Sequence, residues 1–314
     1  MEPPARPYTD VAREAAGGLR MSHRVTTILD GFTFTEAPRW HDGRLWFSDF
    51  YTRRVMSVRA DGTDRRVEAV VERQPSGIGW LPDGRLLVVS MHDRRILRRE
   101  ADGSLVAHAD LSQHATGHLN DMSVDAEGRA YVGNFGFDLM NGAPLETAAL
   151  HRADPDGTVT EVASGLWFPN AIALTSGGVV LVNETFGNRI TAFDLTEDGQ
   201  LTNQRVWAQF GPVPTDRAVA GALKQLDVAP DGSCLDADGG LWVADAIGGR
   251  VIRVIEGGQI TDEIRPGANA YACALGGETG RTLFICTAPD FDEHARRAAR
   301  EGTIVAAAVR TPAA

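Results

Sequence analysis

The chain has 314 residues, a net charge of −11 at pH 7 and 43% hydrophobic residues. A chain of this length and apolar content can bury a substantial core in one large β or α/β domain, and it is not intrinsically disordered. The acidic balance argues against nucleic acid and anionic membrane as partners, and no stretch approaches the roughly 20 apolar residues of a membrane span.

The N-terminus and the cysteines both favour a cytoplasmic protein. Residues 1–22 lack the apolar core of a signal peptide and are expected to form a mobile leader, with Met21 as an alternative start. Cys234, Cys273 and Cys286 lie in apolar runs, and no CxxC spacing is present. We expect three buried free thiols rather than a disulfide framework.

After the leader, one layout recurs six times. Each copy starts on a polar or aromatic residue and continues with an alternating apolar stretch, a glycine turn and a second apolar stretch. In nearly every copy a further alternating strand runs into a DG-type hairpin turn. The copies start at residues 36, 76, 120, 170, 231 and 271. Units of roughly 40–50 residues with four short strands are typical of propeller blades.

The sixth unit lacks a fourth strand. The segment HRVTTILDG, residues 23–31, matches the fourth-strand pattern and is expected to complete the last blade and close the ring, which removes an exposed sheet edge. Residues 23–314 are therefore predicted to form an all-β, six-bladed β-propeller with four antiparallel strands per blade. Helix is expected only within 217–226 and 291–300. A pair of β-sandwiches is the alternative, and it explains the regular repeat less well.

The starts of the six units should meet on one axis, because the first strand of every propeller blade lines the central channel. The aligned residues are Glu36, Ser76, Asn120, Asn170, Asp231 and Tyr271. Two carboxylates and two amides around a channel suit a hard divalent cation. Ca²⁺ is the preferred candidate, and Mg²⁺, Mn²⁺ and Zn²⁺ are the alternatives. The competing interpretation is that each Asn, Asp or Ser only caps a turn.

Four segments show a family resemblance. They are EAPRW (36–40), LNDMSVDAEGR (119–129), PNAIAL (169–174) and PDGSCLDADGGLWVAD (230–245). Together they resemble the family of senescence-marker-protein-30 (SMP-30), gluconolactonase and luciferin-regenerating enzyme (LRE), over roughly residues 24–290. The resemblance implies a six-bladed propeller with one catalytic divalent cation, usually Ca²⁺, and lactone hydrolysis; some relatives cleave organophosphates.

The resemblance also assigns roles to residues. It implies that Glu36, Asn170 and Asp231 are metal ligands, and that Asn120 either ligates the metal or touches substrate. It further implies that Asp231 takes a direct part in hydrolysis. His118 stands where sugar-lactone members tend to carry Arg, which argues against a lactone with many hydroxyl groups.

The expected chemistry is a carbonyl polarised by the cation and a water molecule activated by a base. Asp231 is the candidate base, and His118 or His114 is the candidate to assist it. No GxSxG, HExxH or P-loop motif is present in the sequence. Serine-hydrolase, zincin and nucleotide chemistry therefore lose support.

Substrate contacts are expected from the loops at the metal end of the channel. Three insertions, residues 134–149, 211–229 and 288–302, fall on this face and are predicted to wall or cover the pocket. The candidate substrate-binding residues are Asn120, Tyr51, His92, Phe135, Trp167 and Phe186. The apolar rim favours an aromatic or alkyl-bearing lactone or ester over a free sugar.

Three functions are consistent with these patterns. The first is a metal-dependent hydrolase of lactones or related esters. The second is a relative that uses the same site for phosphotriester hydrolysis or non-hydrolytic ring chemistry, and the third is a binding propeller with a structural cation. A scaffold has no need for two carboxylates and two amides at an open channel mouth, so the hydrolase is preferred. The sequence carries no signal for the oligomeric state.

Overall fold

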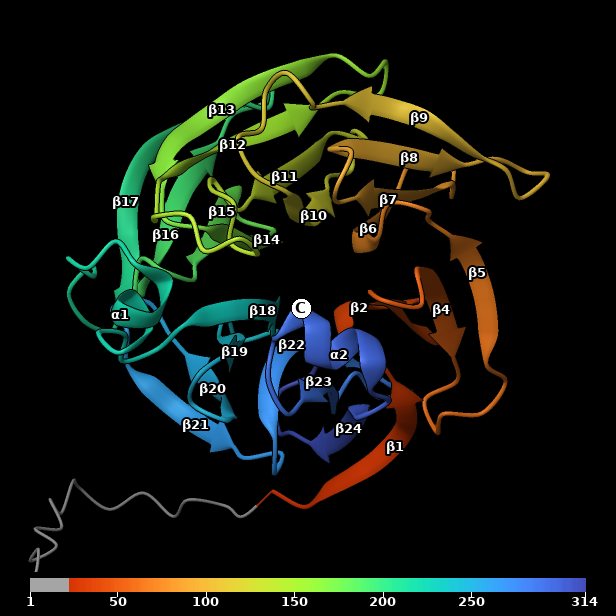
Figure 1. Ribbon diagram of the computed structural model, residues 1–314. Coiled ribbons are helices and arrows are strands. Elements are labelled where there is room, and N and C mark those ends of the chain that lie inside the picture. The colour runs from red at the N-terminus through yellow and green to blue at the C-terminus, as the bar shows by residue number, and fades with distance from the viewer. Residues whose placement is uncertain (1–22) are drawn as a thin grey trace, which may run out of the picture.

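The computed structural model describes residues 23–314, which form six four-stranded antiparallel sheets arranged as blades around a central channel (Figure 1). Within each blade the strands pair in chain order from the channel outwards, except in the last blade. The six-bladed β-propeller predicted from the repeat is confirmed. The predicted leader, residues 1–22 with Met21, lies outside the described residues.

The strands fall into four concentric sets. The innermost strands are β2 (Thr35–His41), β6 (Pro75–Trp80), β10 (Leu119–Val124), β14 (Pro169–Leu174), β18 (Pro230–Leu235) and β22 (Asn269–Gly276). The second strands are β3 (Arg44–Asp49), β7 (Leu86–Ser90), β11 (Ala130–Asn134), β15 (Val179–Glu184), β19 (Leu241–Asp245) and β23 (Thr282–Ala288). The third strands are β4 (Arg54–Val58), β8 (Arg95–Arg99), β12 (Ala148–Ala153), β16 (Arg189–Leu195), β20 (Arg250–Val254) and β24 (Gly302–Ala308). The outer strands are β5 (Arg66–Val70), β9 (Leu105–Asp110), β13 (Val159–Leu166), β17 (Leu201–Gln209), β21 (Ile260–Ile264) and β1 (Val25–Phe32).

The last blade joins the two ends of the described chain. Its strand order is β22-β23-β24-β1, and β1 pairs antiparallel with β24 from Val25 opposite Ala307 to Phe32 opposite Gly302. The N-terminal strand thus closes the ring, as the sequence predicted. Without β1, the edge of β24 would be open to pairing with another chain. The pairing of β1 with β24 covers this edge.

Packing between neighbouring blades fixes the inner strands. All five residues of β7 and all five of β19 are buried, whereas most of the outer strand β17 faces solvent. Between the last two blades, Trp242 packs in one cluster with Leu283 and Ile285. Full burial of such a side chain contributes roughly 1.5–3 kcal/mol, so these layers hold the channel-lining strands firmly in place.

The innermost strands share a local irregularity that the repeat did not predict. In all six, the pairing with the second strand loses its regular register near the strand start, for example between Glu36 and Arg39 and between Pro230 and Ser233. Such bulges re-aim the side chains beside them. They allow the residues at each strand start to point along the channel while the rest of the strand packs between blades.

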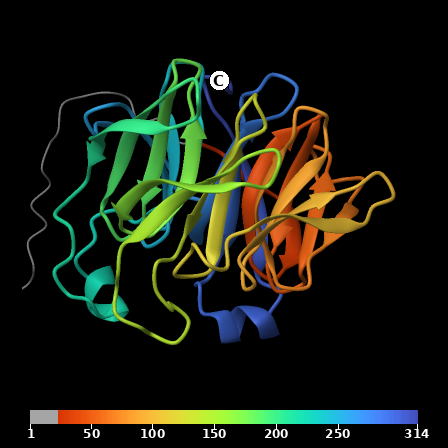
Figure 2. The same ribbon diagram turned by 90° about the horizontal axis from the view of Figure 1, so that it is seen from above.

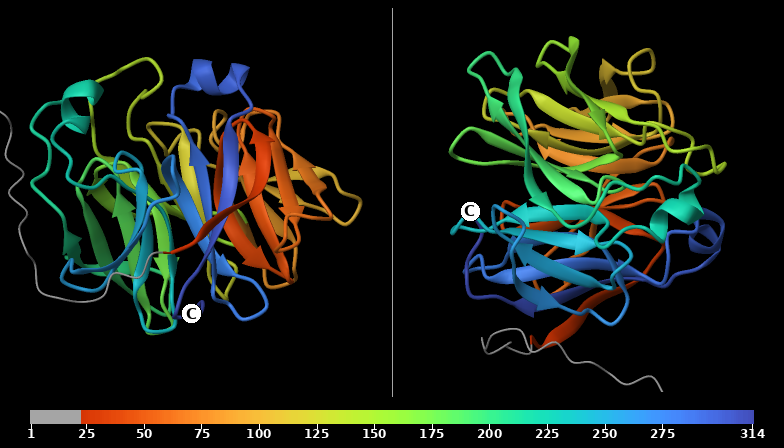
Figure 3. Two further views of the ribbon diagram at one scale, coloured as in Figure 1. Left: turned by 90° about the horizontal axis from the view of Figure 1, so that it is seen from below. Right: turned by 90° about the vertical axis from the view of Figure 1, so that its left-hand side faces the viewer.

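Two short helices lie on one face of the ring. Helix α1 (Val219–Leu223) and helix α2 (Glu293–Ala298) fall inside the two segments predicted to be helical, and both lie on the face opposite the C-terminus (Figures 2 and 3). Asp292 caps α2 by accepting a hydrogen bond from the backbone of Ala295 at 2.7 Å. Within residues 23–314, no helix has the length and apolar character needed to cross a membrane.

Candidate metal centre and active site

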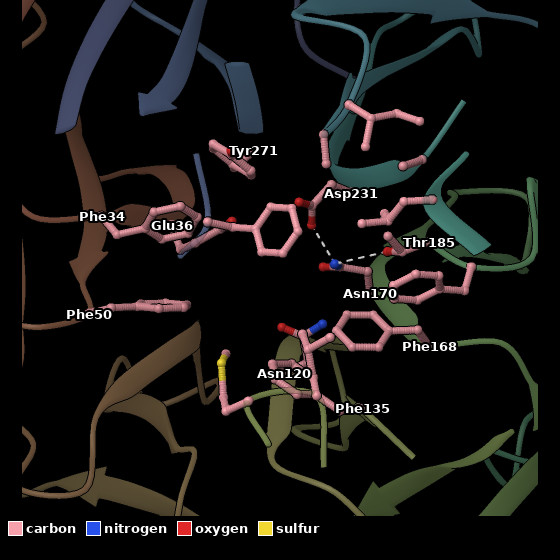
Figure 4. Close-up of a pocket in the computed structure, with 18 of the residues that line it drawn as sticks. Phe34, Glu36, Phe50, Asn120, Phe135, Phe168, Asn170, Thr185, Asp231 and Tyr271 are labelled. Atoms are coloured by element: carbon pink, nitrogen blue, oxygen red, sulfur yellow. Dashed lines mark hydrogen bonds between the residues drawn. The ribbon is translucent and has the colours of Figure 1, made fainter. Parts of the chain in front are cut away.

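The channel ends in a pocket on the helix-bearing face. Glu36, Asn120, Asn170, Asp231 and Tyr271 all line it, and each comes from a different innermost strand (Figure 4). The first four point toward a shared centre in Figure 4. The structure therefore gathers five of the six ring residues predicted from the repeat. Ser76, the sixth, does not line the pocket.

Buried acids at the ends of second strands hold the loops that lead into these positions. Asp49 accepts hydrogen bonds from the backbone of Thr33 and Phe34, just before Glu36, at 3.0 and 3.2 Å. Asp245 accepts from Ala229, two residues before Asp231, at 3.1 Å. In the fourth blade, Glu184 accepts from Trp167 at 2.8 Å. These acids have structural roles, because each satisfies loop amides that would otherwise be buried without a partner.

Asp231 and Asn170 are tied together across two blades. The amide nitrogen of Asn170 donates to the Asp231 carboxylate and to the hydroxyl of Thr185, the latter at 3.2 Å. The Thr185 hydroxyl in turn donates to the carbonyl of Pro230 at 2.8 Å, and Asn183 donates to the carbonyl of Asp231 at 2.5 Å. This network fixes the direction of the Asp231 side chain.

Within residues 23–314, the two carboxylates of the site lack a cationic partner; Asp231 is buried and Glu36 is partly buried. Within residues 23–314, neither Glu36 nor Asp231 forms an ion pair with Lys, Arg or His, while Arg39 pairs with Asp121 at 2.7 Å. Burial, followed by repulsion from Asp121, raises the pKa of Glu36 to about 8 against the opposing hydrogen bond from Ala37 and the charge of Arg39. Burial and then repulsion from Glu36 and Asp121 raise the pKa of Asp231 well above its usual range. Two such acids need a positive charge between them to stay ionised.

The donor set fits a hard divalent cation. Within residues 23–314, the amide nitrogen of Asn120 is buried without a hydrogen-bond partner, and the amide oxygen is the atom of this side chain that can bind a cation in the pocket. In Asn170 the amide nitrogen makes the bonds to Thr185 and Asp231, which leaves the amide oxygen available to a cation. No group of three or more His, Cys, Asp and Glu side chains is gathered in residues 23–314, so a cation here depends on amide oxygens. Oxygen-only coordination favours Ca²⁺ over Zn²⁺.

The remainder of the pocket is apolar. Its wall consists largely of the aromatic residues Phe34, Phe50, Tyr51, Phe135, Phe168, Phe186 and Phe291. Phe135 stacks on Phe168 with ring centroids 4.4 Å apart. The three insertions also contribute, through Leu139 and Met140, Leu223, and Phe291. The structure thus places part of each insertion at the pocket.

The other predicted site residues divide into two groups. Tyr51, Phe135 and Phe186 line the pocket, but His92, His118 and Trp167 do not. The ring of His118 lies beside Phe135, with centroids 5.8 Å apart, and stacks on His92 at 4.5 Å. Desolvation lowers the pKa of His118, and it lowers the pKa of His92 to about 4. The two imidazoles form a neutral pair behind the aromatic wall.

His114 and Trp167 lie outside the pocket as well. The ring of His114 neighbours that of His151, with centroids 5.9 Å apart. Trp167 is covered by the guanidinium of Arg217 at 4.3 Å from its ring. Neither residue is among those that line the pocket. The loops that carry both residues were expected to face substrate, but the His114 ring lies beside His151 on β12, and the Trp167 ring lies beside Arg217.

Sequence reasoning gave no role to Tyr271 and did not find Phe34 or Thr185. Within residues 23–314, the buried hydroxyl of Tyr271 at the pocket makes no hydrogen bond. Burial and the nearby Asp231 raise the pKa of Tyr271, so the hydroxyl stays protonated and can donate. The sequence signal that could have identified Tyr271 as a site residue was its position in the aligned ring. Phe34 stands two residues before Glu36, where only the loop geometry reveals that it reaches the pocket.

The fold and the site together define a six-bladed β-propeller with an oxygen-donor centre at one mouth of its channel. The family model described as "SMP-30/Gluconolactonase/LRE-like region" matches residues 34–289. The chain belongs to this family, as the four sequence segments indicated.

Individual relatives are distant but cover most of the chain. Regucalcin of Danio rerio is 25% identical over 266 residues, which make up 81% of this chain and 82% of regucalcin. The 6-deoxy-6-sulfogluconolactonase of Pseudomonas putida is 29% identical over 259 residues, with 80% and 81% of the two chains covered. The solved structure of luciferin-regenerating enzyme matches with a TM-score of 0.76 at 20% identity, over 93% of this chain and 98% of that one, and supports the fold.

Proposed function

We propose that the protein is a divalent-metal-dependent hydrolase of lactones or related esters, with Ca²⁺ as the preferred ion. One observation carries the proposal: the carboxylates of Glu36 and Asp231, which have no cationic partner within residues 23–314, converge with two amides from two further blades in a largely apolar pocket. Family membership and a relative named as a lactonase support the same reaction class. Glu36, Asn120, Asn170 and Asp231 would hold the ion.

The bound cation supplies a positive charge that polarises the carbonyl of the substrate. Asp231 takes a proton from the attacking water at its carboxylate oxygen, and the Thr185–Asn170 network keeps that carboxylate aimed at the pocket. The water oxygen bonds to the carbonyl carbon, the ring C–O bond breaks, and the proton passes from Asp231 to the departing alkoxide. The product is the open hydroxy acid. The free Tyr271 hydroxyl is placed to donate a hydrogen bond to substrate.

The lining residues favour an apolar substrate. Within the described chain, no Lys or Arg lines the pocket, so an anionic group on the substrate would find no counter-charge. The sulfonated lactone in the name of the Pseudomonas putida relative is therefore not the expected substrate here. His118 occupies the position where sugar-lactone members of the family tend to carry Arg. Its ring lies beside Phe135, and it does not line the pocket, so it adds no polar contact there. These features support a lactone more apolar than a sugar lactone.

A lactone panel tests the proposal. Proton release is followed with a pH indicator on sugar lactones, alkyl lactones and one phosphotriester, after removal of metal with EDTA and after Ca²⁺ is restored. We expect hydrolysis of alkyl lactones, loss with EDTA and recovery with Ca²⁺. Asp231→Asn and Glu36→Gln should lower kcat/KM by at least about 10³-fold, and Ser76→Ala, a ring position outside the pocket, serves as the matched control.

Two results would count against the mechanism. Activity that survives both EDTA and Asp231→Asn would show that neither the metal nor this carboxylate is needed. Turnover of the phosphotriester alone would assign the site to a different reaction.

A further inference from the structure

A second hollow lies directly outside the active-site pocket. Its apolar side is formed by Leu139, Met140, Val219 and Phe291, which come from all three insertions. Leu139, Met140 and Phe291 also line the inner pocket, so the two spaces border on the same three side chains. We call this hollow, with those four residues as its apolar side, the outer groove.

The two spaces differ in size. The inner pocket leaves about 90 Å³ that water can enter, whereas the outer groove leaves about 350 Å³. The inner volume suits a small ring held near Glu36 and Asp231. A substituent of more than a few carbons has to leave the pocket, and the outer groove is the neighbouring space that borders it at Leu139, Met140 and Phe291.

The charges along the groove are already satisfied. Glu293 pairs with Arg297 one helical turn further along α2, and Asp292 caps the same helix. The Arg297 guanidinium lies over the ring of Tyr51, 5.5 Å from its centroid. His294 also lines the groove. The pairing of Glu293 with Arg297 and the capping role of Asp292 leave the apolar stripe as the main surface of the groove that can bind an uncharged ligand.

The apolar stripe is exposed although its surroundings are rigid. Met140 and Phe291 are each 38% exposed, and both lie on the apolar side of the same groove, so they form one apolar surface and are not scattered singly. The insertions are held by a backbone hydrogen bond from Leu145 to Arg217 at 2.7 Å. Arg296, buried under α2, pairs with Glu301 at 2.8 Å. The groove is therefore formed before any ligand arrives.

We infer that the outer groove binds a linear alkyl or acyl chain on the lactone whose ring occupies the inner pocket. The inference rests on the proposed function and names its substrate class: small-ring lactones that carry an extended apolar chain. Full burial of one methylene corresponds to about four-fold in binding. Because the groove is open on one side, we expect roughly two-fold for each methylene that lies in it.

A homologous series of γ-lactones, from γ-butyrolactone to γ-dodecalactone, tests the inference. The readout is the slope of log kcat/KM against chain length, measured with the Ca²⁺-loaded protein below the solubility limit of each lactone. We expect kcat/KM to rise once the chain leaves the inner pocket. Met140→Ser and Phe291→Ser should flatten the slope and lower kcat/KM for the longest lactone roughly ten-fold relative to γ-hexalactone.

The matched control is Val206→Ser on the outer strand β17, an apolar side chain that is 53% exposed and does not line the groove. It should keep the wild-type slope. Equal kcat/KM for all chain lengths, with metal-dependent turnover intact, would overturn the groove assignment and leave the proposed function standing. If no lactone is hydrolysed, the proposed function fails. Titration calorimetry of the same series then tests whether the groove binds the alkyl chain. Affinities that do not change with chain length would overturn the groove assignment.

Discussion

Replacement of Tyr271 by Phe should make the protein more stable and the enzyme slower. Tyr271 is 2% exposed and its hydroxyl has no partner, while the amide of the neighbouring Asn269 donates to Pro289 at 2.8 Å. A buried hydroxyl without a partner costs roughly 1–3 kcal/mol. The Phe ring keeps the contact with Phe34, whose centroid lies 4.7 Å away. We expect a gain of about 1 kcal/mol in the free energy of unfolding, or about 2–4 °C in Tm.

The effect on activity should have the opposite sign. A hydrogen-bond donor aimed at the reacting group of a substrate contributes about 10²–10³-fold to turnover, so kcat/KM of Tyr271→Phe should fall by about that factor. Stability is measured by thermal and urea unfolding in EDTA, and activity by initial rates on an alkyl lactone with Ca²⁺.

Tyr131→Phe provides the matched control for Tyr271→Phe. The hydroxyl of Tyr131 is buried away from the pocket and donates to the carbonyl of Gly199 at 3.1 Å. Its removal leaves that carbonyl short of a donor and should cost about 1 kcal/mol with unchanged activity. A drop in Tm for Tyr271→Phe as large as that for Tyr131→Phe would refute the reasoning, because it would mean that the Tyr271 hydroxyl is satisfied within the fold.

Three further predictions concern metal, pH and backbone packing. Ca²⁺ at about 100 times its dissociation constant should stabilise the EDTA-treated protein by about 2.7 kcal/mol, and Asp231→Asn should abolish this thermal shift. Desolvation lowers the pKa of His151 to about 4 from 6.5, so the unfolded chain binds the proton first as pH falls. The contribution of His151 is complete above pH 6.5 and shrinks by up to about 3 kcal/mol toward pH 4, and His151→Gln should flatten urea-unfolding free energies over this window. A Cβ at Gly232 would lie 2.3 Å from that of Ala272 on the next blade, so Gly232→Ala should lower Tm strongly, whereas Gly177→Ala, with open space around it, should not. An unchanged Tm for Gly232→Ala would contradict the close approach of β18 and β22.

The blade architecture could be read from the sequence because its signals are local. Antiparallel strands joined by short turns, such as β18 and β19, depend on alternation and turn glycines that lie within about 20 residues of each other. Six repeats of that unit imply a closed ring, and the strand-like segment that precedes the first repeat, β1, completes the sixth blade by pairing with β24. The alignment of the repeats also brought together Glu36 and Asp231, which are far apart in the chain, because equivalent positions in a ring share one height along its axis.

The packing of the loops was decided only by the tertiary structure. The sequence placed His92, His118 and Trp167 on the correct loops, but alternation does not define where a loop side chain points. In the fold, Phe135 comes between His118 and the pocket, because aromatic rings gain more from filling the channel mouth than an imidazole does.

What the sequence by itself determined is the number of blades, the closing strand and the residue types that meet on the axis, since these follow from turns and periodicity along the chain. What only the tertiary structure decided is the bulge that turns each ring residue along the channel, the unpartnered Tyr271 hydroxyl and the groove where three insertions meet. Each of these depends on contacts between blades or between insertions, and such contacts arise from packing in three dimensions and leave no periodic trace in the chain.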